Sequence, residues 1–372
     1  MEGFRKNRAN TFKAKKKANI MGKAIKFLFA FFLLLVLGLF IIFSFVKFSG
    51  GGLFLNNLPD DLQNSDIVAD NGSIAVYFCQ QEDCDVPILK LIQNSKISID
   101  CALYDLDYQS FLAAFSEKIS ENVQVRIVVD KDNSKGLEGN VFSFDDNNQL
   151  MHDKFCIFDD SVIFTGSMNP TENDVLKNDN NLIVIDSKVI SSNYKDEFYE
   201  LWNGDFGKGL PVRFSSINLS TESGNILVEN YFCAEDNCEQ KVLEKLQSAQ
   251  KSIYFMTFSF TSDVLGDVLI KKANQGVTVE GVFDESQFNS QKQFSEYMKL
   301  REANLNVSLD KSKYKLHHKV FIIDNKTVIA GSFNPTKNGN EENDENIVIL
   351  HDEGIALQYL REFDRIQLMS HK

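Results

Sequence analysis

The sequence contains little proline and few cysteines: 5 Pro and 6 Cys among 372 residues, with 20 Gly. So little proline and glycine excludes a collagen-like fibre, and so few cysteines exclude a small disulfide-stapled domain. With 43% hydrophobic and 24% charged residues, the chain is not a disordered one either. Its length predicts about two domains with enough apolar residues to form real cores.

Positive charge is scarce outside one short segment. The chain has a formal net charge of −13, but residues 1–26 hold nine lysines and arginines against one glutamate. This segment therefore has a net charge of +8, which leaves −21 for the remainder. The sequence joins a basic tail to an acidic body.

No charged residue interrupts residues 27–46, which read FLFAFFLLLVLGLFIIFSFV. A helix of this length is about 30 Å long, the thickness of a hydrocarbon core. A cleaved signal peptide usually has a shorter apolar region and a small-residue cleavage site, which we do not find. A buried core helix is the other alternative, but a Phe/Leu run this long has no polar face. We expect a transmembrane helix that anchors the chain in a lipid bilayer.

The charges on the two sides of this segment predict its orientation. The lysine excess in residues 1–26, against Lys47 alone after the helix, indicates a cytoplasmic basic tail. Residues 47–66 begin with a Gly-rich stretch and continue as a mostly polar segment, which is typical of a flexible tether. The acidic body would then lie on the extracytoplasmic side of the cell membrane, held by a single-pass anchor.

The remaining chain contains an internal repeat. VYFCQQEDC (76–84) recurs as NYFCAEDNC (230–238), 154 residues later. Downstream, MHDKFCIFDDSVIFTGSMNPT (151–171) recurs as LHHKVFIIDNKTVIAGSFNPT (316–336), 165 residues later. In between, each copy has a β-α-β-α-β pattern with apolar strands, which indicates α/β layers.

Two large copies indicate paired domains, because a solenoid needs about three or more repeats. We expect two α/β/α sandwich halves related by a pseudo-twofold axis. The first half would span residues 67–205 and the second 225–372, with a linker at 206–224.

Both copies contain the spacing His-x-Lys-x4-Asp-x6-Gly-Ser-x-Asn. Alternate side chains on a strand share a face, so each His and Lys can point into one pocket while Asp153 and His318 point away. An ammonium neutralises phosphate oxygens, and an imidazole attacks phosphorus or donates a proton. A lone strand histidine is usually a core residue, but two copies in register favour catalysis. The motif residues are His152, Lys154, Asp159, Ser167 and Asn169, and then His317, Lys319, Asp324, Ser332 and Asn334.

The duplicated motif resembles that of the phospholipase D superfamily, from about residue 70 to 368, and in particular its small nuclease and cardiolipin-hydrolase branch. The resemblance implies a phosphoric diester hydrolase without metal or other cofactor, whose motifs meet between the halves. One histidine would form a phosphohistidine, and the other would protonate the leaving oxygen and then activate water. Asp159 and Asp324 would brace the strand ends. The implied phosphate-binding residues are Lys154, Lys319, Ser167, Asn169, Ser332 and Asn334.

One difference between the copies bears on the roles of the histidines. Glu345 stands 28 residues after His317, whereas Asn180 stands 28 residues after His152. In the family this residue typically holds Nδ1–H of the histidine in the opposite half, so Glu345 would orient His152 and Asn180 would orient His317. A carboxylate makes an imidazole a better nucleophile than an amide does. We therefore expect His152 to be the nucleophile and His317 the general acid and base.

The cysteines predict two local disulfides. Extracytoplasmic thiols meet oxidising conditions, which favours disulfides over free thiols or a zinc site, since the usual C-x2-C spacing is absent. Cys101 and Cys156 lie in apolar strands and are expected in the core. Elsewhere no His/Asp/Glu cluster has metal-ligand spacing, so we expect chelators to leave activity intact. The two C-x4-C pairs are Cys79 with Cys84, and Cys233 with Cys238.

Three functions remain open. A lipid-cleaving enzyme is slightly favoured, because the tether confines the site near phospholipid headgroups and an acidic body binds nucleic acid poorly. The alternative is a membrane-tethered nuclease, since Lys311, Lys313 and Lys315 could follow a nucleic-acid backbone, although they also suit an anionic lipid or a solvated loop. A non-catalytic phosphate-binding module is the remotest, because both motifs are complete. No obligate protein partner is indicated.

Overall fold

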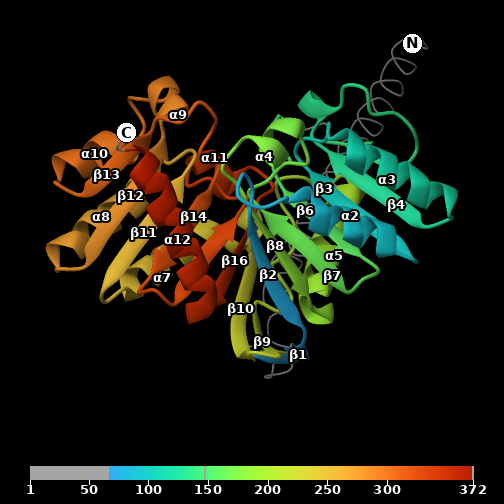
Figure 1. Ribbon diagram of the computed structural model, residues 1–372, viewed down its shortest axis with the longest axis horizontal. Coiled ribbons are helices and arrows are strands. Elements are labelled where there is room, and N and C mark those ends of the chain that lie inside the picture. Colours follow the sequence, from blue (N-terminus) through green and yellow to red (C-terminus); the bar gives the residue numbers. More distant parts are fainter. Residues whose placement is uncertain (1–66, 146–147, 371–372) are drawn as a thin grey trace, which may run out of the picture. The chain divides into compact units, whose positions relative to one another are not determined.

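The structured part of the chain contains two β-sheets with helices packed on them (Figure 1). A computed structural model describes residues 67–145 and 148–370. The expected tail (1–26), transmembrane helix (27–46) and tether (47–66) lie outside the described residues. Among the helices that are described, none is both long enough and apolar enough to cross a bilayer. The predicted α/β class is confirmed.

The first sheet has seven strands in the order β2-β8-β7-β6-β3-β4-β5. Its three strands at one end, β3 to β5, are parallel, and the other pairs are antiparallel. The strands are β2 (Ser73–Phe78), β3 (Ser98–Leu103), β4 (Gln124–Val129), β5 (Phe142–Phe144), β6 (Lys154–Phe158), β7 (Val162–Gly166) and β8 (Asn181–Asp186).

The second sheet repeats this order as β10-β16-β15-β14-β11-β12-β13 and adds β9 and β1 beyond β10. The two halves of the molecule therefore share one strand order, as the internal repeat predicts. The strands are β1 (Val68–Asn71), β9 (Ser216–Thr221), β10 (Gly224–Phe232), β11 (Ser252–Thr257), β12 (Thr278–Asp284), β13 (Asn306–Asp310), β14 (Lys319–Ile323), β15 (Thr327–Gly331) and β16 (Asn346–His351).

The edge of the second sheet corrects two expected boundaries. Residues 206–224, expected as a linker, contain β9, and β1, expected in the first half, pairs in parallel with β9. β9 in turn pairs antiparallel with β10. β9 and β10 are joined by two residues and form a hairpin, and the free backbone edge of β9 then pairs with β1 from the start of the described chain.

The strands that lead out of the two histidine motifs are buried on both faces. All five residues of β6 and all five of β14 are buried. Sheets covered on both sides require strands that are apolar throughout, which explains the runs KFCIF and KVFII.

Helices cover both faces of the sheets. Helix α5 shows how such a helix is bounded: Ser187 Oγ accepts the N–H of Ile190 at its start, and Gly204 ends it with a φ of 92°. The helices are α2 (Asp85–Asn94), α3 (Gln109–Ser120), α4 (Glu172–Leu176), α5 (Lys188–Asn203), α6 (Cys233–Asp236), α7 (Cys238–Ser248), α8 (Asp263–Asn274), α9 (Glu285–Ser290), α10 (Glu296–Glu302), α11 (Lys337–Glu341) and α12 (Glu353–Ser370), with a 3₁₀ turn η2 (Lys131–Asn133).

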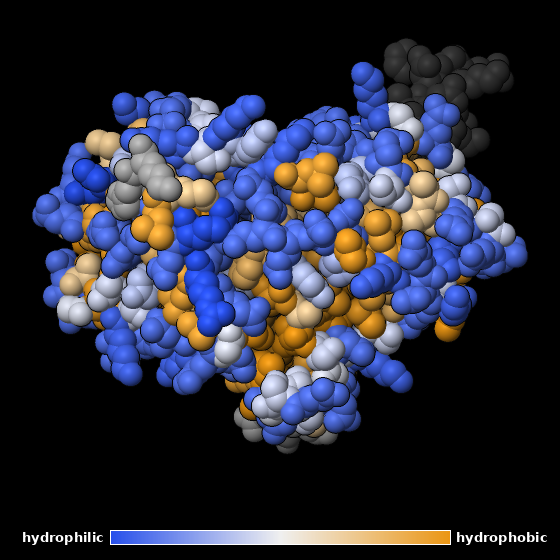
Figure 2. All heavy atoms as spheres, viewed as in Figure 1, coloured by the Kyte–Doolittle hydropathy of each residue, from blue (hydrophilic) through white to orange (hydrophobic). Residues whose placement is uncertain are grey.

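The largest hydrophobic core joins the two halves. It contains Phe155 of β6 and Val320 of β14 together with Tyr194 of α5 and Tyr359 of α12, all fully buried. Separate clusters lie under α2 and α3 in the first half and under α7 and α8 in the second. Figure 2 shows polar residues over most of the visible face and a hydrophobic area over the central strands β2 and β10. The shared core fixes the two sheets relative to each other.

Three disulfides are present, and the two predicted local ones are confirmed. Cys79 bonds to Cys84, and Cys233 bonds to Cys238. The other two cysteines lie in the core, as expected, but the structure adds a bond that was not expected: Cys101 and Cys156 face each other across β3 and β6. Their positions on separate strands, 55 residues apart, gave no sign of this pairing in the sequence.

Candidate active site

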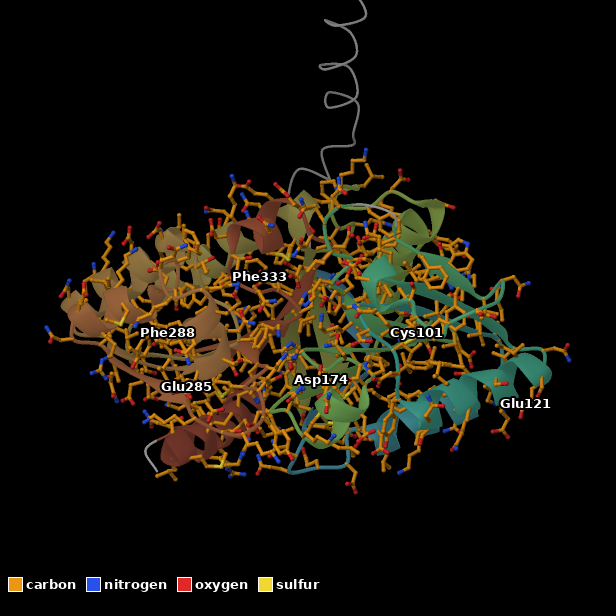
Figure 3. The ribbon with its side chains drawn as sticks, turned by 90° about the horizontal axis from the view of Figure 1, so that it is seen from above. Cys101, Glu121, Asp174, Glu285, Phe288 and Phe333 are labelled. Carbon is orange, nitrogen blue, oxygen red and sulfur yellow. A yellow bond between two sulfur atoms is a disulfide. The ribbon has the colours of Figure 1, made fainter. Side chains whose placement is uncertain are left out.

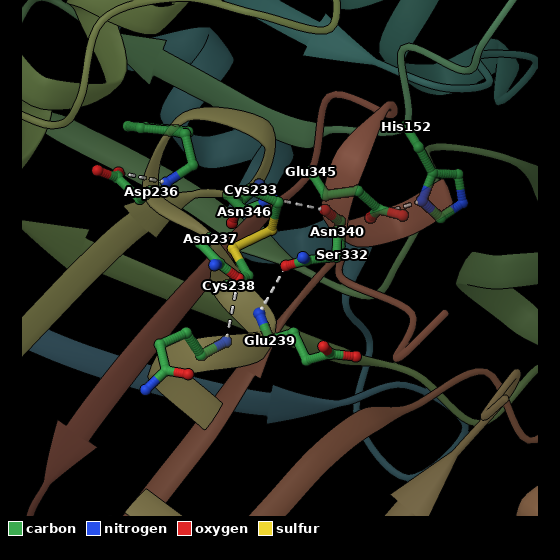
Figure 4. Close-up of a disulfide and its surroundings, with 12 residues drawn as sticks. His152, Cys233, Asp236, Asn237, Cys238, Glu239, Ser332, Asn340, Glu345 and Asn346 are labelled. Carbon is green, nitrogen blue, oxygen red and sulfur yellow. Dashed lines mark hydrogen bonds and ion pairs between the residues drawn. A yellow bond between two sulfur atoms is a disulfide. The ribbon is translucent and has the colours of Figure 1, made fainter. Parts of the chain in front are cut away.

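His152 is positioned by backbone pairing between the two halves. Met151 forms a parallel bridge with Asp344, and the His152 N–H donates to the Asp344 carbonyl at 2.9 Å. Glu345 follows Asp344 directly, so this pairing brings its carboxylate beside the imidazole. Glu345 Oε2 lies 2.8 Å from His152 Nδ1 (Figure 4). The expected contact between the two side chains is present.

His317 is positioned in the same way. Its N–H donates to the carbonyl of Asp179 at 2.8 Å, and its Nδ1 lies 2.9 Å from Asn180 Oδ1. Ser167 Oγ donates to the same amide oxygen at 2.9 Å, and Asn180 Nδ2 donates to the Asp174 carbonyl at 3.2 Å. These bonds orient the Asn180 amide with its oxygen toward the imidazole of His317. Nδ1 of His317 therefore carries the proton, and Nε2 is the nitrogen available for chemistry.

The two local disulfides support the residues that orient the histidines. The backbone N–H of Cys233 donates to the carbonyl of Glu345 at 2.8 Å (Figure 4), and that of Cys79 donates to the carbonyl of Asn180 at 3.0 Å. Each disulfide therefore stiffens the loop that holds one orienting residue. The two C-x4-C pairs, which stand at equivalent positions in the repeat, therefore have the same role of supporting an orienting residue.

The two motif lysines are buried next to the histidines of their own motif. Lys154 Nζ donates to the His152 carbonyl at 2.5 Å, and Lys319 Nζ donates to the His317 carbonyl at 2.8 Å. Their exposed fractions are 0% and 3%. An ammonium held this far from water interacts strongly with any anion that reaches it.

Two aromatic rings complete the surroundings of these pairs. The ring centroid of Tyr104 lies 4.8 Å from that of His152 and 5.2 Å from Lys154 Nζ. Phe258, which stands 154 residues later, lies 4.7 Å and 4.9 Å from the corresponding groups. We did not predict these residues, although the repeat spacing aligns them and could have identified them.

Burial shifts the pKa values of the two histidines, the two motif lysines and Glu345 toward their neutral forms. It lowers the pKa of His152 and of His317 well below the ordinary range, and the nearby ammonium groups lower both further. It also lowers the pKa of Lys154 to about 8 and that of Lys319 well below its ordinary value. Burial raises the pKa of Glu345 to about 8, against the opposing effect of Lys154. A bound anion would supply negative charge next to these cations.

Both histidines line one cavity of about 1120 Å³, at which the two halves meet. Asn169 and Asn334 line it too, and their amide oxygens have no hydrogen-bond partner among the described residues. Asn169 Nδ2 donates to Asp174 Oδ2 at 2.6 Å, so the group that remains for a ligand is the acceptor.

The walls of this cavity differ in charge. Residues 148–150 (Asn-Gln-Leu) line the first-half wall, and residues 313–315 (Lys-Tyr-Lys), at the equivalent place in the repeat, line the second-half wall. Lys337 adds a third positive charge to the second-half wall, whereas Asp105 and Asp174 add negative charge to the first. A diester bound here would meet different surroundings at its two ends.

The structure corrects the expectation for Ser167 and Ser332. Both are fully buried, and neither lines the cavity. Ser167 Oγ accepts the Asn181 N–H at 3.0 Å in addition to its bond to Asn180, and Ser332 Oγ accepts the Asn346 N–H at 2.9 Å. The two serines hold the strand that follows each orienting residue instead of binding a substrate.

Asp159 and Asp324, expected to brace strand ends, directly follow the ends of β6 and β14 and bind the starts of the neighbouring strands β3 and β11. Asp159 Oδ1 accepts the N–H groups of Ile97 and Ser98, at 2.7 and 3.0 Å. Asp324 Oδ1 accepts those of residues 251 and 252 at the same two distances. Neither side chain lines the cavity.

Asp153 and His318 face the interface between the halves. Asn346 Nδ2 donates to Asp153 Oδ1 at 2.5 Å, and Asn181 Nδ2 lies 3.1 Å from His318 Nδ1. Glu362 approaches the other ring nitrogen of His318 at 3.1 Å. Within residues 67–145 and 148–370, no group of three or more His, Cys, Asp or Glu is arranged to hold a metal ion.

Known proteins share both the sequence pattern and the fold. The family model described as "Cardiolipin synthase, PLD-like domain" matches residues 88–202 and 242–367, one stretch in each half. A phospholipase D of Rickettsia typhi is 32% identical over 134 residues, which cover 36% of this chain and 65% of that protein. A mitochondrial cardiolipin hydrolase of Chlamydomonas reinhardtii is 31% identical, over 36% of this chain and 63% of that protein.

A solved structure of phosphatidylserine synthase from Haemophilus influenzae Rd KW20 resembles the whole described fold. Its TM-score is 0.60 with 12% identity, and the likeness covers 84% of this chain and 90% of that one. Two similar sheets with a cavity between them, lined by residues of both histidine motifs, define the phospholipase D-like class. The chain belongs to the phospholipase D superfamily.

Proposed function

We propose that the chain hydrolyses a phosphodiester in two steps through a phosphohistidine on His152. The observation that carries this proposal is the opening of His152 and His317 into one cavity, each with Nδ1 held by a residue of the opposite half. Holding Nδ1 leaves Nε2 of each ring for chemistry.

In the first step His152 Nε2 attacks phosphorus, and the bond from phosphorus to the leaving oxygen breaks as His317 Nε2 donates its proton to that oxygen. In the second step His317 takes a proton from water, which attacks phosphorus and breaks the phosphorus–nitrogen bond. The products are an alcohol and a phosphate monoester. Lys154 and Lys319 stabilise the charge on the nonbridging oxygens throughout.

The orienting residues support this assignment of roles. Glu345 stabilises an imidazolium, the form that His152 takes once it bonds to phosphorus. Burial lowers the pKa of His152, which keeps Nε2 unprotonated and nucleophilic in the free enzyme. The arriving phosphodiester anion would raise the pKa of His317, so that it can act as the acid.

Trapping the intermediate tests the proposal. After brief reaction with a diester labelled in its phosphoryl group, quenching in alkali should preserve a phosphohistidine. Peptide mapping should then find the label on the peptide that contains His152. Label on a His317 peptide would reverse the two roles, and the absence of any covalent label during turnover would contradict the two-step mechanism.

We further propose that residues 27–46 anchor the enzyme in the cell membrane, with residues 1–26 in the cytoplasm, and that a phospholipid is the substrate. Support comes from the uncharged run and its basic flank, and from relatives named phospholipase D and cardiolipin hydrolase. The second candidate is a nuclease. The Lys-Tyr-Lys wall at 313–315 and the exposed Phe294, which lines the same cavity, favour this alternative, since basic and aromatic groups suit single strands.

Vesicles and single-stranded DNA distinguish these candidates. The full chain should release phosphatidic acid from vesicles that contain cardiolipin and phosphatidylcholine, and a chain lacking 27–46 should do so much more slowly and no longer sediment with membranes. Rapid cleavage of single-stranded DNA that declines steeply with salt, without lipid hydrolysis, would establish the nuclease instead.

A further inference from the structure

Asp174 is a buried carboxylate in the cavity wall that the repeated motif does not include. It lies on α4, is 4% exposed and lines the cavity. Figure 3 shows it in the middle of the molecule, where the elements of the two halves meet. Its Oδ2 lies 3.4 Å from His317 Nδ1. Nδ1 of His317 therefore lies close to the negative charge of Asp174 as well as to its hydrogen-bond partner Asn180.

This charge occurs in one half of the molecule only. The motif shift of 165 residues places Gly339 at the equivalent position of α11. A Cβ atom added to Gly339 would lie 2.5 Å from the carbonyl oxygen of Asn334, so a side chain does not fit there. His152 consequently has one carboxylate partner, Glu345, whereas His317 has an amide and a separate carboxylate.

Hydrogen bonds hold Asp174 in this place. Its Oδ2 accepts both the backbone N–H and the side-chain Nδ2 of Asn169, at 2.9 and 2.6 Å. Its Oδ1 accepts Asn178 Nδ2 at 2.5 Å. Because every one of these contacts is an N–H donor, they hold the group as an acceptor, and its negative charge remains directed at His317.

The charge of Asp174 also acts on three other groups around the cavity. Its charge raises the pKa of His152, of Lys154 and of Lys319 against the lowering caused by burial. Asp174 is therefore a counter-charge shared by the cationic groups, placed on the His317 side of the cavity.

We propose that Asp174 is a positioning residue that makes His317 an effective general acid in place of the carboxylate missing at Asn180. For His152, Glu345 both orients the ring and stabilises its charged form; for His317, two residues provide these two effects. Asn180 accepts the Nδ1 proton and fixes the ring, and Asp174 supplies the negative charge that stabilises the imidazolium. This inference rests on the proposed function, in which His317 protonates the leaving oxygen.

Leaving-group dependence tests the inference. An alkoxide must be protonated as it departs, whereas p-nitrophenolate departs without help. In Asp174→Asn, kcat should fall at least 30-fold for an alkyl phosphodiester and at most threefold for the matched p-nitrophenyl diester. The alkaline limb of the alkyl reaction should also move to lower pH, because the imidazolium of His317 has lost a stabilising charge.

Two further variants make the result decisive. Glu172→Gln, which neutralises an exposed carboxylate on the same helix, should leave both reactions unchanged. Adding Asn180→Asp to Asp174→Asn should restore the alkyl reaction, since a carboxylate then contacts Nδ1 directly. Equal losses for both diesters, without a pH shift or rescue, would show a merely structural role. A wild-type chain inactive on both diesters would instead overturn the proposed function together with this inference.

Discussion

Replacing His152 with alanine should lower kcat at least about 10³-fold for every phosphodiester substrate, whatever its leaving group. The reason is that, in the proposed mechanism, Nε2 of this residue forms the bond to phosphorus. Water is a weaker nucleophile and lacks the orientation that Glu345 provides to the imidazole. Steady-state hydrolysis of the p-nitrophenyl and alkyl diesters by the full chain measures the effect.

The corresponding change at His317 should behave differently. Without its general acid, His317→Ala should lose the alkyl reaction as severely as His152→Ala does, yet retain a measurable first turnover of the p-nitrophenyl diester. His351→Ala provides the control, because His351, the last residue of β16, contacts Thr327 and Glu229 on the neighbouring strands and lies outside the cavity lining. If His152→Ala retained a burst of p-nitrophenolate and His317→Ala did not, the roles would be the reverse of those proposed.

The repeat explains why so much of the site could be predicted from the sequence. Side chains two positions apart in extended chain share a face, which predicted that each His and Lys would point into one pocket. The two histidines line the cavity, whereas Lys154 and Lys319 lie buried behind its lining residues. Comparison of the two copies also singled out Glu345 and Asn180, and the structure brings each to the histidine of the other half. These inferences depend on local geometry and on spacing, which the sequence records directly.

Other features depend on pairings that spacing does not record. Ser167 lies in the same motif as Asn169, but only the fold shows that its hydroxyl turns toward Asn180 and not toward the cavity. Asp174 has Gly339 at the equivalent position of the second copy, so comparison of the two copies does not identify it. Two other pairings also join residues that are far apart in the sequence. They are the pairing of β1 with β9 and the bond between Cys101 and Cys156.

Replacing either motif lysine with methionine should reduce kcat/KM by about 10²–10³-fold, the usual consequence of removing one pre-positioned group that stabilises transition-state charge. Lys154 shows why the loss should depend on pH. Burial lowers its pKa to about 8, so the ammonium is present below pH 8 and is lost above it. Wild-type kcat/KM should therefore fall as the pH rises above about 8, and Lys154→Met should show a smaller decline over that range.

Although Lys154→Met should lower activity, it should raise the stability of the fold. Because the folded-state pKa of Lys154 lies below the ordinary value of 10.5, the charged lysine destabilises the fold at neutral pH, and this cost disappears as the pH rises toward 10.5. Lys154→Met should raise the free energy of unfolding at pH 7 by about 1–3 kcal/mol, measured by urea denaturation. Lys272 is the matched control: it is also buried and donates to a backbone carbonyl, that of Ala249 at 2.9 Å, but it belongs to neither histidine motif. Lys272→Met should leave kcat/KM within about twofold of wild type. Loss of both activity and stability in Lys154→Met would mean that the lysine supports the fold and that its buried charge is not held in place for the substrate.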